Sequence, residues 1–150
     1  MESVIRSHPN AREVSRHVTE LPTEFEVQRV GDRWLVAGPT GIFAVGRTDR
    51  DVVRDAERTS VLAHDVRSSL SDLMPWVPFV DSLLVAHHDQ LADLDLADLA
   101  CTVIEVDMLT IALTTGAVTI GPDELAELYH HLPLVVSSLQ HDQRGSLDPA

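Results

Sequence analysis

Residues 33–46 read RWLVAGPTGIFAVG, and this stretch decides the fold of the chain. Its two apolar runs are joined by the turn Gly38-Pro39-Thr40-Gly41. Pro39 fixes its own φ, and the two glycines are free to adopt a positive φ, as tight turns require. The stretch therefore predicts a β-hairpin made of two largely apolar strands.

The segments on either side of the hairpin add a helix, a strand and a second helix. Residues 10–20 carry apolar side chains at helical spacing, and residues 25–29 alternate as a half-exposed strand does. Thr48 or Asp49 can cap a long helix that runs to about Ser71. The apolar stripe expected along this helix consists of Val52, Val53, Ala56, Ala63, Val66, Leu70 and Leu73.

The second half of the chain contains two further apolar strands and two helices. Residues 80–86 and 102–106 have the composition of strands buried inside a sheet. Helices are expected at residues 107–113 and from Pro122 to just before Pro133, with residues 134–139 forming a separate turn. Residues 89–100 fit a short helix and an acidic loop equally well.

This order of elements predicts the fold class α/β, as a three-layer sandwich with a central mixed sheet. The elements follow one another as helix, three-stranded meander, helix, strand, strand and helices. We expect one domain over residues 1–140 and a flexible tail over residues 141–150, where the sequence turns polar.

The charge of the chain limits its partners. The net charge is −13, and all 11 basic residues are arginines, so no reaction here can use a lysine. An acidic surface repels phosphate backbones, which makes nucleic acid an unexpected partner. No apolar run reaches the roughly 18 residues of a membrane span, and the lone Cys101, which we expect in the core, allows no internal disulfide. We therefore expect a cytoplasmic protein that does not bind membranes.

The hairpin and the order of elements resemble the nuclease-related domain family, a branch of the PD-(D/E)XK or restriction-endonuclease-like fold. Residues 38–45 match the family's Gly-Pro-x-Gly turn and second strand, and residues 103–109 and 120–125 resemble its final strand and closing helix. The resemblance covers most of residues 25–132. It implies a site in which carboxylates hold a magnesium ion that activates water, while a lysine positions the nucleophile and offsets charge in the transition state.

The residues that would carry this chemistry are replaced. The family's acid-x-Lys triplet falls on Gly46-Arg47-Thr48, and its opening aspartate falls near Arg33. Asp32 lies one residue away, which on a strand places it on the opposite face. Glycine cannot ligate a metal, and threonine cannot replace a cation. The resemblance thus implies a degenerate member with a vestigial cleft formed by Glu13, Asp32, Arg33, Gly46, Arg47 and Thr48.

Two functions of different class follow. The first is a catalytically inactive nuclease-like domain that serves as a binding or scaffold module, without a cofactor and with a protein partner, for which a second copy of the chain is a candidate. The alternative is a nuclease that depends on Mg²⁺ or Mn²⁺ and has a rearranged active site, with Asp32 and a glutamate such as Glu13 or Glu20. If the resemblance is confined to the fold, neither function follows from it.

Two surfaces are candidates for an interaction. Trp76 lies between two prolines and either packs over the sheet edge or, if exposed, anchors a partner. Arg47, Arg50, Arg54 and Arg58 form a basic stripe at near-helical spacing, although interleaved acids favour pairing on the helix surface.

The histidine pairs and an acidic segment are the remaining features. The neighbours within each pair, His87-His88 and His130-His131, face different ways, so neither pair suits one metal ion. The aspartates at 93, 95 and 98 lack the glycine and the distant glutamate of a calcium loop, and we expect a solvated acidic surface.

Overall fold

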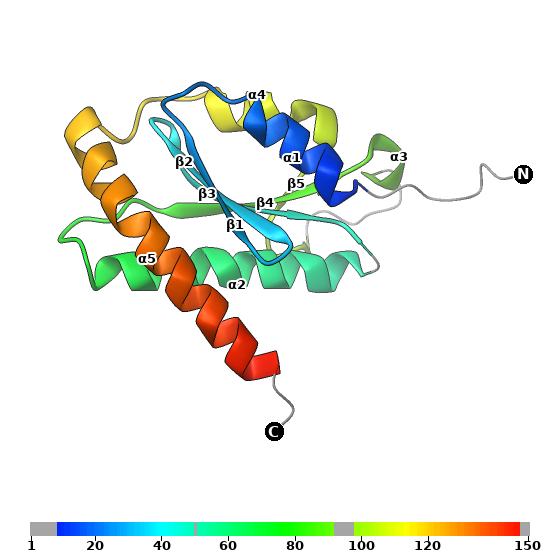
Figure 1. Ribbon diagram of the computed structural model, residues 1–150. Helices are drawn as coiled ribbons and strands as arrows, with labels where there is room; N and C mark the ends of the chain where they lie inside the picture. The colour runs from blue at the N-terminus through cyan, green and yellow to red at the C-terminus, as the bar shows by residue number, and fades with distance from the viewer. Residues whose placement is uncertain (1–8, 50, 92–97, 148–150) are drawn as a thin grey trace, which may run out of the picture.

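The computed structural model of this chain describes residues 9–49, 51–91 and 98–147. A five-stranded sheet lies between two layers of helices, with α1 and α4 on one face and α2 and α5 on the other (Figure 1). The predicted three-layer α/β sandwich with a central mixed sheet is therefore confirmed.

The strands follow one another across the sheet in chain order. They are β1 (Glu26–Val30), β2 (Arg33–Gly38), β3 (Gly41–Arg47), β4 (Val80–Ala86) and β5 (Thr102–Glu105). The first three form an antiparallel meander, and β3, β4 and β5 run parallel. The hairpin predicted over residues 33–46 is thus β2 and β3, at the centre of the sheet.

The helices are α1 (Ala11–Thr19), α2 (Val52–Ser71), the short α3 (His88–Leu91), α4 (Leu109–Thr114) and α5 (Pro122–Leu147), and a 3₁₀ turn, η3 (Val106–Met108), precedes α4. Of these, α2 makes the crossover from β3 to its parallel neighbour β4, and α3 lies in the connection from β4 to β5. Asp51, rather than Thr48 or Asp49, caps α2, because its carboxylate accepts a hydrogen bond from the Arg54 N–H. Asn10 caps α1 in the same way.

The two glycines of the hairpin turn have different physical roles. Gly41 adopts a φ of +143°, a conformation that side-chain-bearing residues rarely take. Gly38 does not have a positive φ; instead, a Cβ there would overlap the ring of Phe25. Of the two glycines that are free to adopt a positive φ, only Gly41 does so, whereas Gly38 is needed for space.

Side chains of the central hairpin alternate between two cores, one on each face of the sheet. The core under α2 and α5 contains Leu35, Ala37, Ile42, Ala44, Leu62, Val66, Leu128 and Leu132. The core under α1 and α4 contains Val14, Val18, Trp34, Val36, Phe43, Val45, Leu109 and Leu113. A sheet that is covered on both faces explains why its central strands read as nearly continuous apolar runs.

The apolar stripe of α2 differs from the predicted one at both ends. Val53 and Leu73 are exposed, whereas Thr59 and Leu62 are buried against the sheet. The buried residues of α2 recur every three or four positions and so lie on one side of the helix. Val53 lies on the other side and faces solvent. Leu73 lies beyond the last turn of the helix.

Helix α5 does not stop before Pro133, and it continues past residue 140, where the flexible tail was predicted. The buried side chains on either side of the proline form one stripe: Leu125, Leu128, Leu132, Val135, Val136 and Leu139. Pro133 itself is exposed, so its ring lies outside the core. Burial of the stripe outweighs the hydrogen bond that a proline removes from a helix.

Strand β5 lies at the edge of the sheet, so the prediction of a strand buried inside the sheet is wrong for this segment. Its residues are half-buried or exposed, because only β4 pairs with it among the described strands. Two of the aspartates of the acidic segment, at 93 and 95, lie outside the described residues. Within the described ranges no helix is both long and apolar enough to cross a membrane.

Candidate functional site

The end of the hairpin, where the resemblance places catalytic residues, is packed against helix α2. Trp34 pairs with Val45, which brings Arg33 and Gly46, the next residues along their strands, beside one another. A Cβ on Gly46 would overlap Thr59 Oγ1. The Thr59 hydroxyl donates to the Asp55 carbonyl oxygen at 2.8 Å and accepts from Arg33 Nε at 3.4 Å. Helix α2 therefore fills the space that a side chain at residue 46 would need.

Arg33 places a guanidinium where the family's opening aspartate would lie. Its Nη1 is 3.0 Å from Asp32 Oδ1, and the Asp32 side chain is 63% exposed in the turn between β1 and β2. Asp55, on α2, is a half-buried acid whose charge interacts with that of Arg33. Burial raises the pKa of Asp55, while the hydrogen bond from the Asp49 N–H and the charge of Arg33 lower it.

Thr48 stands where the resemblance places a lysine, and it is hydrogen-bonded to helix α3. It is fully buried, and its hydroxyl donates to Gln90 Oε1 at 2.9 Å. The same oxygen accepts from the His87 N–H at 2.9 Å, and the Thr48 N–H donates to the Val85 carbonyl oxygen. These bonds join the carboxyl ends of β3 and β4 to helix α3.

Glu13 and Arg47 belong to the opposite face of the sheet, toward α1. Glu13 Oε1 lies 2.9 Å from His87 Nε2, and Arg47 Nη1 lies 3.3 Å from the Pro9 carbonyl oxygen. Arg47 alternates with Gly46 along β3, which explains why the two residues face different layers. The six residues of the vestigial cleft are thus divided: Arg33 and Gly46 meet at α2, Thr48 is bonded to Gln90 of α3, Glu13 and Arg47 lie on the α1 side, and Asp32 is in an exposed turn.

Nothing in the described ranges forms an evident metal centre. There, no three histidine, cysteine, aspartate or glutamate side chains come close enough to hold one ion. His88 is mostly exposed, 3.3 Å from Glu105 Oε1, so it does not share a site with His87. The rings of His130 and His131 meet edge to face with their centroids 5.3 Å apart.

The basic stripe does not form a single surface among the described residues. Arg54 and Arg58 are exposed on α2, whereas Arg47 is half-buried on the sheet. Arg50 lies outside the described residues. The connection between α2 and β4 offers a clearer surface.

Three exposed apolar side chains recur along that connection. Leu73, Trp76 and Phe79 are 43%, 43% and 70% exposed, and we call them the 73–79 patch. Met74 and Val77, which lie between them, pack into the core under α2 and α5. Of the two positions considered for Trp76, the structure thus gives the exposed one.

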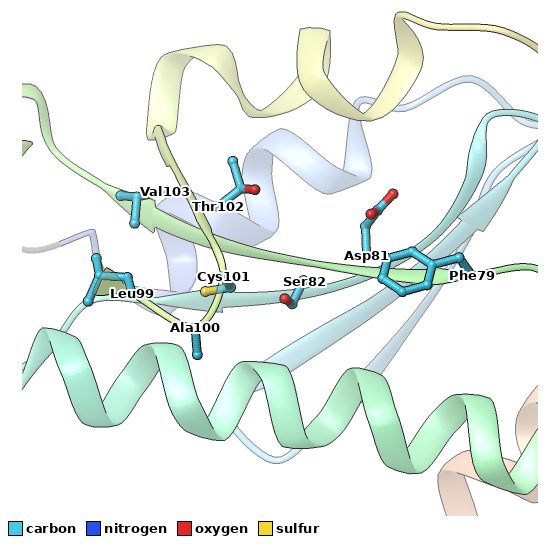
Figure 2. Close-up of a pocket in the computed structure, with 8 residues that line it drawn as sticks. All are labelled: Phe79, Asp81, Ser82, Leu99, Ala100, Cys101, Thr102 and Val103. Atoms are coloured by element: carbon cyan, nitrogen blue, oxygen red, sulfur yellow. The ribbon is translucent and has the colours of Figure 1, made fainter. Parts of the chain in front are cut away.

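A pocket of about 500 Å³ opens beside Phe79, between the start of β4 and the segment that leads into β5 (Figure 2). Its lining consists of Phe79, Asp81, Ser82, Leu99, Ala100, Cys101, Thr102 and Val103. Cys101 is only half-buried, so it is not the core residue that was expected. Burial nevertheless raises the pKa of its thiol to about 11, and a hydrogen bond with Ser82 opposes this shift.

The sequence did not predict this pocket. Its lining comes from two separate segments, and the space between them depends on where β5 stops pairing with β4. The residues themselves carry no motif, and only the exposed aromatic pair Trp76 and Phe79 gives a local signal. Comparisons with protein-family models, with curated proteins and with solved structures give no match to this chain. The functional argument therefore depends on the residues and on the geometry given above.

Proposed function

We propose that this chain is a non-catalytic binding module built on a nuclease-like α/β fold. The observation that carries the proposal is the closed end of the hairpin, where Gly46 packs against Thr59 and Thr48 is buried against Gln90. A nuclease of the family that the chain resembles needs a carboxylate at the first position and a lysine at the second. Here the first position has no space for a side chain, and the second has no charge.

Loss of these groups removes both parts of the catalytic machinery. Without carboxylates that hold a Mg²⁺ or Mn²⁺ ion, the pKa of water is not lowered toward neutrality, and water remains a poor nucleophile at neutral pH. Arg33 does supply a cation, but it is paired with Asp32 and Thr59. The charge of −13 further opposes a nucleic-acid substrate.

The 73–79 patch supports a role in binding a protein. Tryptophan and other large aromatic side chains provide the largest share of binding energy at many interfaces. Since Met74 and Val77 are held in the core, the exposed side chains of Leu73, Trp76 and Phe79 are carried on an anchored segment. Two copies of a chain with this charge repel one another, so we favour a partner with a basic surface over a second copy.

The proposal places this module in the cytoplasm, in keeping with a single cysteine that has no partner for an internal disulfide. No cofactor is required for binding. The alternative of a rearranged nuclease would need Asp32 and Glu13 to share an ion, although each has a different partner: Arg33 for Asp32 and His87 for Glu13.

A cleavage assay tests the catalytic half of the proposal. Supercoiled plasmid and single-stranded oligonucleotide are incubated with Mg²⁺ or Mn²⁺ and with the wild type, Asp32→Ala or Glu13→Ala. We expect all three proteins to give the same background as a mock preparation. Metal-dependent cleavage that is lost in Asp32→Ala would contradict the proposal and would support the rearranged nuclease.

Sedimentation velocity over a wide concentration range tests the choice of partner. Trp76→Ser removes the central side chain of the patch, and Val53→Ser removes an equally exposed apolar side chain from α2 as a control. We expect the wild type to remain monomeric. A dimer that Trp76→Ser dissociates, and Val53→Ser does not, would instead identify a second copy as the partner.

A further inference from the structure

The pocket beside Phe79 exists because β5 pairs with only part of β4. The pairing starts at Leu83 and Thr102, so among the described strands the first residues of β4, Val80 to Ser82, have a partner on the β3 side only. The chain before Thr102 departs from the sheet, and the space left is about 500 Å³. This volume is within the range of small-molecule sites, about 300–1,000 Å³.

The side chains around this space mainly accept hydrogen bonds. The Asp81 carboxylate lies close to the Phe79 ring at one end, and Cys101 lies beside Ser82 (Figure 2). An ionised carboxylate accepts only, and the hydroxyls of Ser82 and Thr102 can accept. None of the eight residues that line the pocket is basic. The pocket is therefore suited to a ligand that donates hydrogen bonds.

Asp81 is the charged group of the pocket, and its charge is not balanced. Among the described residues no hydrogen bond or ion pair reaches its carboxylate. Burial raises the pKa of Asp81, and no neighbouring cation lowers it. Asp81 is nevertheless an exposed residue, so its carboxylate faces solvent beside the pocket, where a ligand can reach it, and it has no partner in the described part of the chain. A bound cation would supply that partner.

We propose that this pocket binds a guanidinium group. A guanidinium is planar, donates in a fork that matches a carboxylate, and stacks on aromatic faces, so Asp81 and Phe79 can hold it together. The Thr102 hydroxyl, which points to the same side of the sheet as Asp81 (Figure 2), can accept a remaining N–H group, whereas Ser82 points to the other side. An ammonium ion cannot stack in this way, a neutral ligand leaves Asp81 unpaired, and an anion is repelled. The inference goes beyond the proposed function and uses none of the hairpin residues.

A guanidinium can come from a free metabolite or from an arginine side chain of a protein. Phe79 belongs both to this pocket and to the 73–79 patch. A protein that covers the patch would therefore bring its own side chains to the mouth of the pocket. The two sources share their chemistry, and the test below separates them.

A titration followed by amide ¹H–¹⁵N NMR spectra tests the inference on the full chain. The probes are agmatine, as a free small cation, and N-acetyl-arginine N-methylamide, as a blocked arginine residue. The matching citrulline derivative has nearly the same shape without the charge. We expect the two guanidinium probes to shift the amide signals of residues 79–82 and 99–103, and the citrulline derivative to leave them in place.

Asp81→Asn is the deciding variant, and Asp72→Asn is its matched control on an exposed acid outside the pocket. Loss of a charge-assisted pair should weaken both guanidinium probes about tenfold or more in Asp81→Asn, whereas Asp72→Asn should change affinity less than about twofold. Phe79→Leu, which keeps an apolar side chain without a ring, should weaken them about threefold. The same spectra show whether each variant remains folded.

The tighter of the two guanidinium probes identifies the source, either a metabolite or a protein side chain. The inference is overturned if neither probe shifts these signals at about 10 mM, a concentration tenfold above a Kd of about 1 mM. It is also overturned if Asp81→Asn binds as well as the wild type, or if the citrulline derivative binds as well as the arginine derivative. These outcomes leave the cleavage test of the proposed function unaffected.

Discussion

Thr59 Oγ1 occupies the place where a Cβ on residue 46 would have to stand. Helix α2 can approach β3 this closely only because residue 46 is a glycine. The hydroxyl cannot easily turn away, because it donates to the Asp55 carbonyl oxygen and accepts from Arg33 Nε. One contact thus links the sequence change at the hairpin end to the packing of the long helix.

Gly46→Ala is expected to destabilise the protein by about 1–3 kcal/mol, because the added methyl group overpacks a filled site. Thr59→Ala removes the overlapping oxygen, so the double variant should recover part of the loss. Urea denaturation of the wild type, both single variants and the double variant measures the four free energies of unfolding. If the changes in the free energy of unfolding of the two single variants simply add up in the double variant, the two side chains do not clash.

The sequence predicted those elements whose signal is local. The hairpin follows from the Gly-Pro-Thr-Gly turn, and α2 follows from its helical spacing. The contact between Gly46 and Thr59 has no local sequence signal, because neither segment contains a pattern that indicates which face of helix α2 packs against the end of β3. The resemblance to a nuclease family raised the question of Gly46, and only the packing answered why a glycine is required there.

Long-range packing also explains the other differences. Pro133 has a strong local preference to end a helix, but the buried stripe that includes Leu132 and Val136 is continuous through it. The pocket depends on where β5 stops pairing with β4, which the composition of Thr102 to Glu105 does not reveal. The pocket roles of Asp81, which lies within the strand predicted at residues 80–86, and of Phe79, just before it, were therefore not predicted.

Gln90→Leu should destabilise the protein by roughly 1–3 kcal/mol, because it leaves the buried Thr48 hydroxyl and the His87 N–H without their acceptor. Thr48→Val is the matched variant: it removes the hydroxyl, and Gln90 still accepts from His87. Its cost should be smaller, about 1 kcal/mol. Thermal or urea unfolding measures the loss of stability in both variants. A larger loss in Thr48→Val than in Gln90→Leu would contradict this hydrogen-bond network.

Tyr129 ties α5 to the meander, because its hydroxyl reaches the carbonyl oxygens of Glu24 and Ala37. Tyr129→Phe should cost about 1 kcal/mol for the lost hydrogen bond. Burial, together with Glu26 and Glu24, raises the pKa of Tyr129 from 10.0 to about 12. The unfolded chain therefore releases this proton first as the pH rises.

The stability that Tyr129 contributes should be complete below pH 10 and should be lost as the pH rises toward about 12. Urea denaturation between pH 9 and pH 11, as rough limits of the window, should show a steeper decline in the wild type than in Tyr129→Phe. Identical declines would mean that the hydroxyl titrates alike in both states.

Cys101 should react slowly with iodoacetamide in the folded protein. A pKa raised from 9.0 to about 11 lowers the thiolate fraction near pH 8, and the higher nucleophilicity of the remaining thiolate restores part of the rate. The expected net effect is about tenfold slower alkylation than in urea-unfolded protein. Ser82→Ala should slow it further, because the hydrogen bond from Ser82 opposes the shift. Equal rates in folded and unfolded protein would contradict this environment.

The central claim is that the hairpin end no longer holds a catalytic metal ion, and paramagnetic broadening by Mn²⁺ tests it most directly. Amide signals of Gly46, Arg47 and Thr48 are followed in the wild type and in Glu13→Ala and Asp32→Ala during a Mn²⁺ titration. The account predicts weak broadening spread over the acidic surface, with these three signals no more affected than others. Selective broadening of the three signals at substoichiometric Mn²⁺, lost in either variant, would contradict it.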